Sequence, residues 1–233
     1  MAPTAKNLIE SRIGTQRDGP HVKIVATSGR IRVAIIEDER SVRQALAFQL
    51  DTAGLEVVPY ACAEELLEAK DAQKFDCVVA DIYLPGMNGL QLQEELNRTV
   101  PYASIVFLTG HGELSIGMHA MRKGAVDFLE KPVDDQVLLD SIARGAELSR
   151  NRRAEHAKRT ELEERQDSLT SRERETFTLI TTGLLNKQVG AELGTTERTI
   201  KAHRARIMNK MGAGSLAELV QMAEILQIHS AHK

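Results

Sequence analysis

The sequence predicts an α/β domain built on a five-stranded parallel sheet, followed by a small domain made only of helices. Five short apolar runs alternate with five helical patterns between residue 31 and about residue 148. The remaining C-terminal part of the chain shows helical patterns and no strand pattern. Strands that alternate with helices are typical of a parallel sheet covered on both faces, so we expect a doubly wound arrangement.

The five apolar runs are the expected strands of this sheet. They cover residues 31–38, 55–60, 75–81, 103–110 and 125–131. A helical pattern follows each run, starting near residues 41, 63, 89 and 114 and, for the fifth, after Pro132. Apolar side chains recur in the fifth pattern at helical spacing, as in Leu138, Leu139 and Ile142, which favours a helix packed on the sheet along one side.

Three stretches frame the two predicted domains. Residues 1–29 show little apolar periodicity, so we expect a disordered N-terminal extension, although VKIVA (22–26) has the composition of a strand. Residues 149–167 are highly charged and contain neither glycine nor proline, which predicts a charged helical linker. The domains are therefore expected at residues 30–148 and 168–233.

Charge is distributed unevenly between these domains. Residues 31–148 carry 10 Lys and Arg against 20 Asp and Glu, whereas residues 170–212 carry 8 against 4. An acidic domain joined to a basic one indicates that the two have different partners.

Composition also limits the compartment and the class of protein. The chain has no apolar run of about 18 residues and no layout of a secretory signal, so we expect a cytoplasmic protein with no membrane partner. Its two cysteines, Cys62 and Cys77, are too few for a zinc site or a disulfide framework.

Polar side chains end four of the predicted strands. Glu37 and Asp38 end the first strand, Asp81 the third, Thr109 the fourth and Lys131 the fifth. The carboxyl ends of strands one, three and four are neighbours in a doubly wound sheet, so we expect these groups to share one crevice.

Three carboxylates so close together repel one another unless a cation neutralises them. Oxygen ligands select a hard ion, so Mg²⁺ is the expected cofactor. A lysine and a hydroxyl on the other side of the metal suit the oxygens of an incoming phosphoryl group. We therefore predict that Asp81 attacks phosphorus.

Four motifs, in this order and spacing, resemble the receiver domain of a two-component response regulator. They are IIEDE (35–39), ADIYLPGMNGL (80–90), FLTGHG (107–112) and AVDFLEKP (125–132). The resemblance covers about residues 31–148 and implies a flavodoxin-like fold. It also implies that Asp81 is the phospho-acceptor and that Mg²⁺ is held by Glu37, Asp38, Asp81 and the backbone carbonyl of Tyr83.

The same resemblance implies roles for further side chains. Lys131 would hold the phosphoryl oxygens, Thr109 would move to bond one of them, and Phe128 stands at the aromatic switch position. Tyr83 and His111 lie two residues beyond Asp81 and Thr109, where side chains of this family tune the lifetime of the phosphoryl group. A passive place at the rim of the pocket is the alternative for both.

Residues 186–212 have the layout of a helix-turn-helix. Asn186 begins one helix, Gly194 makes the turn, and Thr195 or Thr196 caps a second helix. The inward stripe of the second helix consists of Ile200, His203, Ile207 and Met211. Four basic residues lie off that stripe and are available to phosphates or base edges: Arg198, Lys201, Arg204 and Arg206.

Residues 169–212 are similar to the LuxR/NarL-type helix-turn-helix, and a fourth helix follows from residue 215. The similarity implies that the third helix, about 196–210, enters the major groove. Base contacts are implied for Lys201, Ala202 and Ala205, and phosphate contacts for Lys187, Thr196, Thr199, Arg206 and Lys210. Because alanines make no bidentate bonds to bases, we expect specificity to rest on Lys201, Arg198 and DNA shape.

Together the two resemblances imply a response regulator of the FixJ/NarL class, a transcription factor switched by phosphorylation. The implied partners are a sensor histidine kinase, double-stranded promoter DNA and a second copy in a homodimer formed on phosphorylation. We expect no enzyme activity beyond the receiver's own phosphorylation and slow dephosphorylation.

Two other functions would use some of the same residues. A metal-dependent phosphatase of the haloacid-dehalogenase type would use Asp81 as its nucleophile, but it needs a second acid two residues on, where this chain has Tyr83. A constitutive DNA-binding regulator would use the receiver only as a dimerisation scaffold. The acidic residues, Thr109 and Lys131 argue against that alternative, and DNA binding by Asp81→Asn under phosphorylating conditions separates the two.

Overall fold

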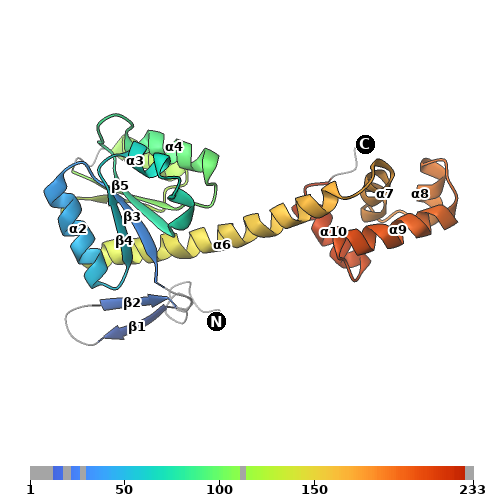
Figure 1. The fold of residues 1–233 in the computed structure, drawn as a ribbon, viewed down its shortest axis with the longest axis horizontal. Helices are drawn as coiled ribbons and strands as arrows, with labels where there is room; N and C mark the ends of the chain where they lie inside the picture. The colour runs from blue at the N-terminus through green and yellow to red at the C-terminus, as the bar shows by residue number, and fades with distance from the viewer. Residues whose placement is uncertain (1–12, 18–21, 27–29, 111–113, 229–233) are drawn as a thin grey trace. The chain divides into compact units, whose positions relative to one another are not determined.

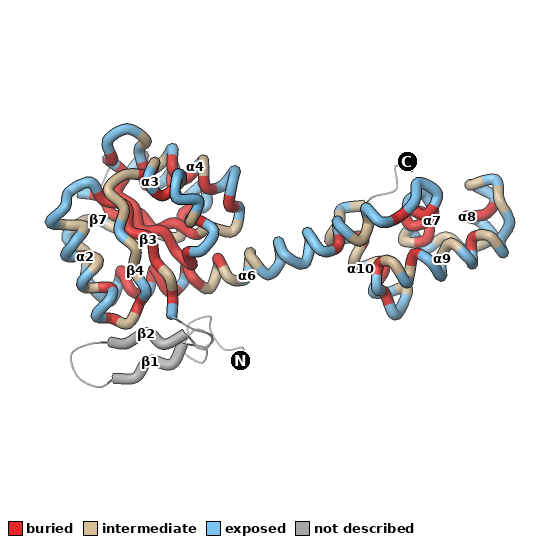
Figure 2. Tube along the Cα trace, in the orientation of Figure 1, coloured by how far each residue is buried: buried red, intermediate tan, exposed pale blue. Residues whose placement is uncertain are grey.

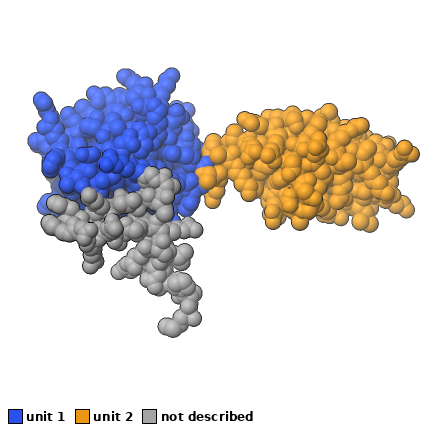
Figure 3. Space-filling view, turned by 60° about the horizontal axis from the view of Figure 1, so that its bottom comes forward, with its two compact units in different colours: residues 1–153 blue, residues 154–233 orange. Residues whose placement is uncertain are grey.

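The computed structural model describes residues 13–17, 22–26, 30–110 and 114–228 (Figure 1). The chain divides into two compact units, residues 1–153 and 154–233, which are coloured separately in Figure 3.

The first unit is built on the predicted five-stranded parallel sheet. Its strands are β3 (Arg32–Ile36), β4 (Glu56–Tyr60), β5 (Cys77–Asp81), β6 (Ile105–Thr109) and β7 (Asp127–Glu130). They lie in the order β4-β3-β5-β6-β7, so the doubly wound topology is confirmed. The register pairs Ile36 with Ala80 and Asp81 with Leu108, which brings the carboxyl ends of β3, β5 and β6 to one edge of the sheet.

Helices cover both faces of this sheet. They are α2 (Arg40–Thr52), α3 (Ala63–Glu68), α4 (Gly89–Thr99), α5 (Leu114–Arg122) and α6 (Asp135–Asp167), with a short 3-10 helix, η1 (Ala72–Lys74). Helices α2 and α6 share one core with alternate strand residues such as Val79. Helices α3, α4 and α5 share the other core, which includes Phe107. Strands β3, β5 and β6 are therefore buried almost throughout, as the continuous apolar runs predicted, whereas the edge strands β4 and β7 are only partly buried (Figure 2).

The N-terminal extension differs from the expected disorder at two short stretches. Strands β1 (Ile13–Arg17) and β2 (Val22–Ala26) pair antiparallel, with Ile13 opposite Ala26. Strand β2 is the VKIVA stretch whose composition indicated a strand. The other residues of the extension lie outside the described residues, so disorder stays a prediction for them.

The predicted linker, residues 149–167, is the second half of the single helix α6. Its first residues pack on the sheet unit, where Arg150 pairs with Asp76 at 3.1 Å. Its last turns pack on the helical unit, since Leu162 is buried there and Arg165 donates a hydrogen bond to a backbone carbonyl. Residues 154–161, between these anchors, are exposed throughout, as the charged composition predicted.

The second unit consists of helices, as predicted. They are α7 (Ser171–Thr181), α8 (Asn186–Glu192), α9 (Glu197–Met211) and α10 (Leu216–Ile225), packed around a core that includes Phe177 and Ile200. The side chain of Thr170 caps α7 and that of Ser215 caps α10. No helix within the described part of the chain is both long enough and apolar enough to span a membrane.

Candidate functional site

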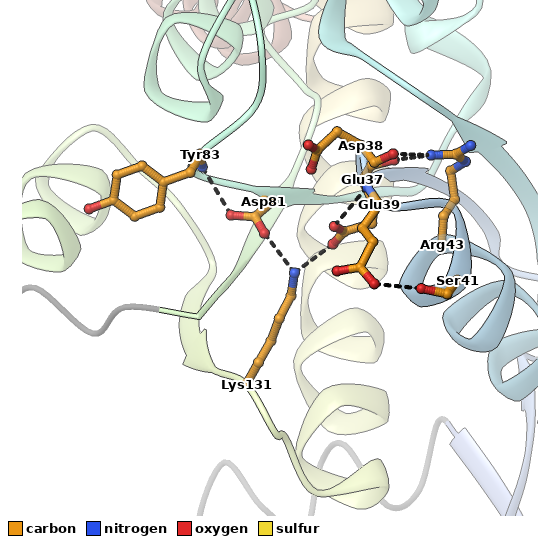
Figure 4. A network of polar contacts seen from close by, with 8 residues as sticks. All are labelled: Glu37, Asp38, Glu39, Ser41, Arg43, Asp81, Tyr83 and Lys131. Carbon is orange, nitrogen blue, oxygen red and sulfur yellow. Dashed lines mark hydrogen bonds and ion pairs between the residues drawn. The ribbon is translucent and has the colours of Figure 1, made fainter.

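A pocket opens at the carboxyl edge of the sheet, beside the ends of β3 and β5 (Figure 4). It is lined by Glu37, Asp38, Glu39, Val42, Asp81, Tyr83, Gly110 and Lys131. The sheet order brings these side chains together although they are far apart in the sequence, because the carboxyl ends of parallel strands lie at the same edge. The convergence predicted for Glu37, Asp38, Asp81 and Lys131 is present.

Lys131 lies between two buried carboxylates. Its Nζ donates hydrogen bonds to Glu37 Oε2 at 2.5 Å and to Asp81 Oδ2 at 2.6 Å. Glu37 is 3% exposed and Asp81 is 9% exposed. Burial lowers the pKa of Lys131, but the hydrogen bonds and negative charges of Asp81 and Glu37 outweigh this, and the pKa is raised. The ammonium group is therefore a permanent positive charge in the pocket.

The Asp81 carboxylate is held at both oxygens. Oδ2 accepts from Lys131, and Oδ1 accepts from the backbone N–H of Tyr83 at 2.9 Å. The Tyr83 ring points away from Lys131 and is 47% exposed (Figure 4). The backbone of Tyr83 thus orients Asp81, while its side chain leaves the pocket open.

The pocket fits Mg²⁺ by the type of its donors, since its acidic side chains supply the oxygen ligands that this ion prefers. Within the described ranges, however, no three acidic, histidine or cysteine side chains are arranged to hold a metal ion together. Lys131 Nζ takes the place between Glu37 and Asp81, and Asp38 is exposed. Arg43 donates to the backbone carbonyls of Glu37 and Asp38, which fixes the end of β3 but not their carboxylates.

Two of the remaining predicted receiver residues, Thr109 and Phe128, are described, and neither lines the pocket. Thr109 is fully buried, and its carbonyl accepts from the Lys131 N–H at 2.8 Å, but Gly110 lines the pocket in its place. Phe128 is half-buried and lies against Gly117, where a Cβ atom would stand 3.1 Å from the ring. His111 lies outside the described residues, so its role stays a prediction.

Helices α8 and α9 form the predicted helix-turn-helix. Gly194 adopts φ +63° in the turn, a conformation that favours glycine. A Cβ atom on Gly190 would lie 2.9 Å from the Thr195 carbonyl oxygen, so α8 and the turn approach closely. Thr196 caps α9 by accepting from the Thr199 N–H at 3.2 Å.

Most of the predicted DNA contacts are exposed side chains of this motif. The exposed members are Lys187, Thr196, Arg198, Lys201, Ala202, Ala205 and Arg206. Thr199 is half-buried, and its hydroxyl is 2.9 Å from that of Thr196. Lys201 pairs with Glu197 at 3.0 Å, but both side chains are exposed, so this pair is easily exchanged for a DNA phosphate. His203 is half-buried, as expected of a packing residue.

Lys210 differs from the other predicted contacts, because it is bound inside the unit. Its Nζ donates to Glu173 Oε2 at 2.7 Å and to the Ser168 carbonyl at 2.9 Å. Hydrogen bonds from Lys210 and from the Thr170 backbone lower the pKa of the buried Glu173 carboxyl to about 2. Thr170 and Glu173 have the spacing of a capping box, so their contact is visible in the sequence, but no local pattern connects Glu173 to a lysine 37 residues away.

Lys210→Met is expected to destabilise the helical unit by about 2 kcal/mol at pH 7, because it leaves a buried carboxylate without its cation. A carboxyl whose pKa is depressed from 4.5 contributes stability above pH 4.5, and loses it as the pH falls towards 2. Urea unfolding at pH 7 and at pH 3 should therefore show a smaller difference at pH 3. Arg159→Met, which breaks an exposed pair with Glu163, is the matched control and should cost less than about 0.5 kcal/mol.

Three residues of the pocket wall, Glu39, Val42 and Gly110, were not predicted from the sequence. Glu39 belongs to the IIEDE motif, and Gly110 follows Thr109 directly, so proximity to predicted residues was a usable signal for both. Val42 lies on α2, and only the packing of that helix on the sheet places it there.

Two family models match the chain. The response regulator receiver domain matches residues 33–143, and the bacterial regulatory proteins of the luxR family match residues 167–223. Nodulation protein W of Bradyrhizobium diazoefficiens is 42% identical over 200 residues, which are 86% of this chain and 88% of that protein. Transcriptional regulatory protein FixJ of Azorhizobium caulinodans is 39% identical over 195 residues, with coverages of 82% and 90%.

Two solved structures are similar to this chain over most of its length. The response regulator StyR superimposes with a TM-score of 0.71 at 40% identity and covers 84% of this chain and 99% of its own. Full-length FixJ from B. japonicum gives a TM-score of 0.52 at 34% identity, with coverages of 86% and 98%. A receiver domain joined to a LuxR-type helix-turn-helix domain defines a response regulator with a DNA-binding output. The chain belongs to the FixJ/NarL-type family of two-component transcriptional regulators.

Proposed function

We propose that this protein is a cytoplasmic transcription regulator that is switched by phosphorylation of Asp81. A sensor histidine kinase supplies the phosphoryl group, and the phosphorylated protein binds promoter DNA as a homodimer. The observation that supports this most is the Lys131 ammonium group, held 2.5 Å from Glu37 and 2.6 Å from Asp81 at an open pocket.

The pocket suits a nucleophilic attack by Asp81. One carboxylate oxygen forms the new bond to phosphorus while the bond from phosphorus to the histidine nitrogen of the kinase breaks, and the freed imidazole keeps that electron pair. Lys131 then moves its hydrogen bond from Asp81 to a phosphoryl oxygen, and the Thr109 hydroxyl bonds another. Bound Mg²⁺, held by Glu37, Asp38, Asp81 and the Tyr83 carbonyl, would supply positive charge to the transferring phosphoryl oxygens. The reaction needs no other substrate, so the protein acts as a regulator and not as an enzyme on other molecules.

An apolar surface beside Phe128 supports dimerisation. Leu114, Met118 and Met121 of α5 are 76%, 47% and 45% exposed, and they line a groove with Phe128. Movement of Thr109 and of the Phe128 ring on phosphorylation would reshape this groove. Turning a mostly inactive population into a mostly active one needs about 5.5 kcal/mol of differential stabilisation, much of which new charge-assisted bonds to a phosphoryl group can supply.

The exposed face of α9 supports DNA binding in the major groove. A homodimer would present two such helices about 34–36 Å apart, which predicts a two-fold symmetric site. Arg206→Ala is expected to weaken binding on every sequence and to reduce the salt slope of log K by about 1, because an exposed arginine here is a phosphate contact. Titration of labelled DNA at several salt concentrations measures both. Arg159→Ala, exposed on α6, should change neither, and an unchanged slope in Arg206→Ala would contradict the assignment.

One experiment tests the whole proposal. The protein is treated with Mg²⁺ and a small-molecule phosphodonor, and its intact mass, oligomeric state and DNA affinity are recorded together. The mass should rise by one phosphoryl group, dimers should form, and DNA affinity should increase. If the protein gains a phosphoryl group but does not dimerise, phosphorylation would be supported and dimerisation would be rejected as the switch. Tight DNA binding without any uptake would favour the constitutive regulator.

A further inference from the structure

The loop of residues 82–88 joins β5 to α4 and contributes Tyr83 to the lining of the Asp81 pocket. It is tied at its start, where the Tyr83 N–H donates to Asp81 Oδ1 at 2.9 Å. It is closed at its base, where the Gly89 N–H donates to the Ile82 carbonyl at 2.9 Å. The position of this loop therefore sets the orientation of the Asp81 carboxylate.

Glu64, on the neighbouring helix α3, reaches the far end of the same loop. Its Oε1 accepts a hydrogen bond from the Met87 N–H at 2.7 Å. Gly86, the preceding residue, adopts φ +74°, and a Cβ atom there would lie 2.5 Å from the same Oε1. The other carboxylate oxygen of Glu64, Oε2, is buried without a hydrogen-bond partner among the described residues. The Glu64 carboxylate is thus packed against the loop. It occupies space that is free because residue 86 is a glycine and has no Cβ atom.

The contact is suited to an ionised carboxylate. Hydrogen bonds from its own backbone N–H and from that of Met87 lower the pKa of Glu64. Between Met87 and Tyr83, Leu84 is buried, Pro85 has a restricted φ and Gly86 is packed against Glu64, so the loop has little freedom to absorb a displacement. A shift at Met87 would therefore reach the backbone of Tyr83.

We propose that Glu64 is a positioning residue for phosphoryl transfer, whose carboxylate fixes the loop at Met87 so that the Tyr83 backbone holds Asp81 in the orientation for attack. This inference rests on the proposed function of Asp81. Misplacing a reacting group by about 1 Å can cost about 100-fold in rate, so a contact outside the pocket has a measurable effect.

Three variants of α3 test this inference. Glu64→Ala removes the acceptor, Glu64→Gln keeps one carbonyl oxygen for Met87, and Glu68→Ala changes an exposed glutamate of the same helix. Phosphorylation by a small-molecule phosphodonor with Mg²⁺ is followed by intact mass, and amide hydrogen exchange of Met87 reports the contact itself. We expect Glu64→Ala to be phosphorylated about 10- to 100-fold more slowly, with faster exchange at Met87. Glu64→Gln should recover most of the rate, and Glu68→Ala should match the wild type.

The outcomes separate this inference from the proposed function. A wild-type phosphorylation rate in folded Glu64→Ala would overturn the inference and leave the proposed function intact. No uptake by the wild-type protein would overturn both, while protection of the Met87 amide would still report whether the contact exists. Where Glu64→Ala does not fold, Gly86→Ala disturbs the same contact from the loop side and should slow phosphorylation to a similar extent.

Discussion

Asp81→Asn is expected to take up no phosphoryl group from a small-molecule phosphodonor under conditions in which the wild-type protein gains one. The amide keeps the shape of the side chain, and its one carbonyl oxygen can accept a hydrogen bond from Lys131 or from the Tyr83 backbone, but not from both. It lacks the negatively charged oxygen that attacks phosphorus. Intact mass, recorded with Mg²⁺ present, is the direct measurement, and the expected loss is complete.

The same variant decides between a switched and a constitutive regulator. Under phosphorylating conditions its DNA affinity should stay at the level of the untreated wild-type protein. Asp51→Asn, which changes an exposed aspartate of α2, is the matched control and should be phosphorylated normally. A mass gain that persists in Asp81→Asn would move the phospho-acceptor to another residue. An affinity equal to that of the phosphorylated wild type would support the constitutive regulator.

The architecture of the sheet unit was predictable because its central strands are continuous apolar runs and because four of the five predicted strands end in a polar residue. A strand buried on both faces has to be apolar along its whole length, so Val78 and Val79 carry the same signal although they face different helices. The sheet order then follows from the doubly wound topology. For that reason Glu37, Asp81 and Lys131 could be placed in one pocket from the sequence.

The contacts that side chains make with residues far apart in the sequence were not predictable. Lys131 bonds Asp81 across 50 residues, Glu64 bonds Met87 across 23, and Lys210 bonds Glu173 across 37. Each depends on how a long side chain folds back in the packed structure, for which local periodicity carries no signal. The sequence could therefore predict which strand ends meet, but not which side chains of the pocket bond one another.

Lys131→Met is expected to act on both phosphorylation and stability, because one ammonium group serves two buried carboxylates. Phosphorylation should slow by about 100-fold, the effect of removing one donor to the oxygens on which charge develops. The free energy of unfolding at pH 7 should fall by about 2 kcal/mol, less than for a fully enclosed pair because the lysine side chain is 23% exposed.

The pH dependence identifies the cause of that loss. In the wild type the pKa of Lys131 is raised above its ordinary value of 10.5, so its contribution is complete at neutral pH and is lost only in more alkaline solution. The Lys131→Met variant has no such group, so its difference from wild type should shrink as the pH rises from 7 to about 11. Lys123→Met breaks an exposed pair with Glu94, at 3.5 Å, and should change stability by less than about 1 kcal/mol at either pH. A loss in Lys131→Met that is the same at both pH values would point to packing of the lysine stem, and not to its charge, as the stabilising contribution.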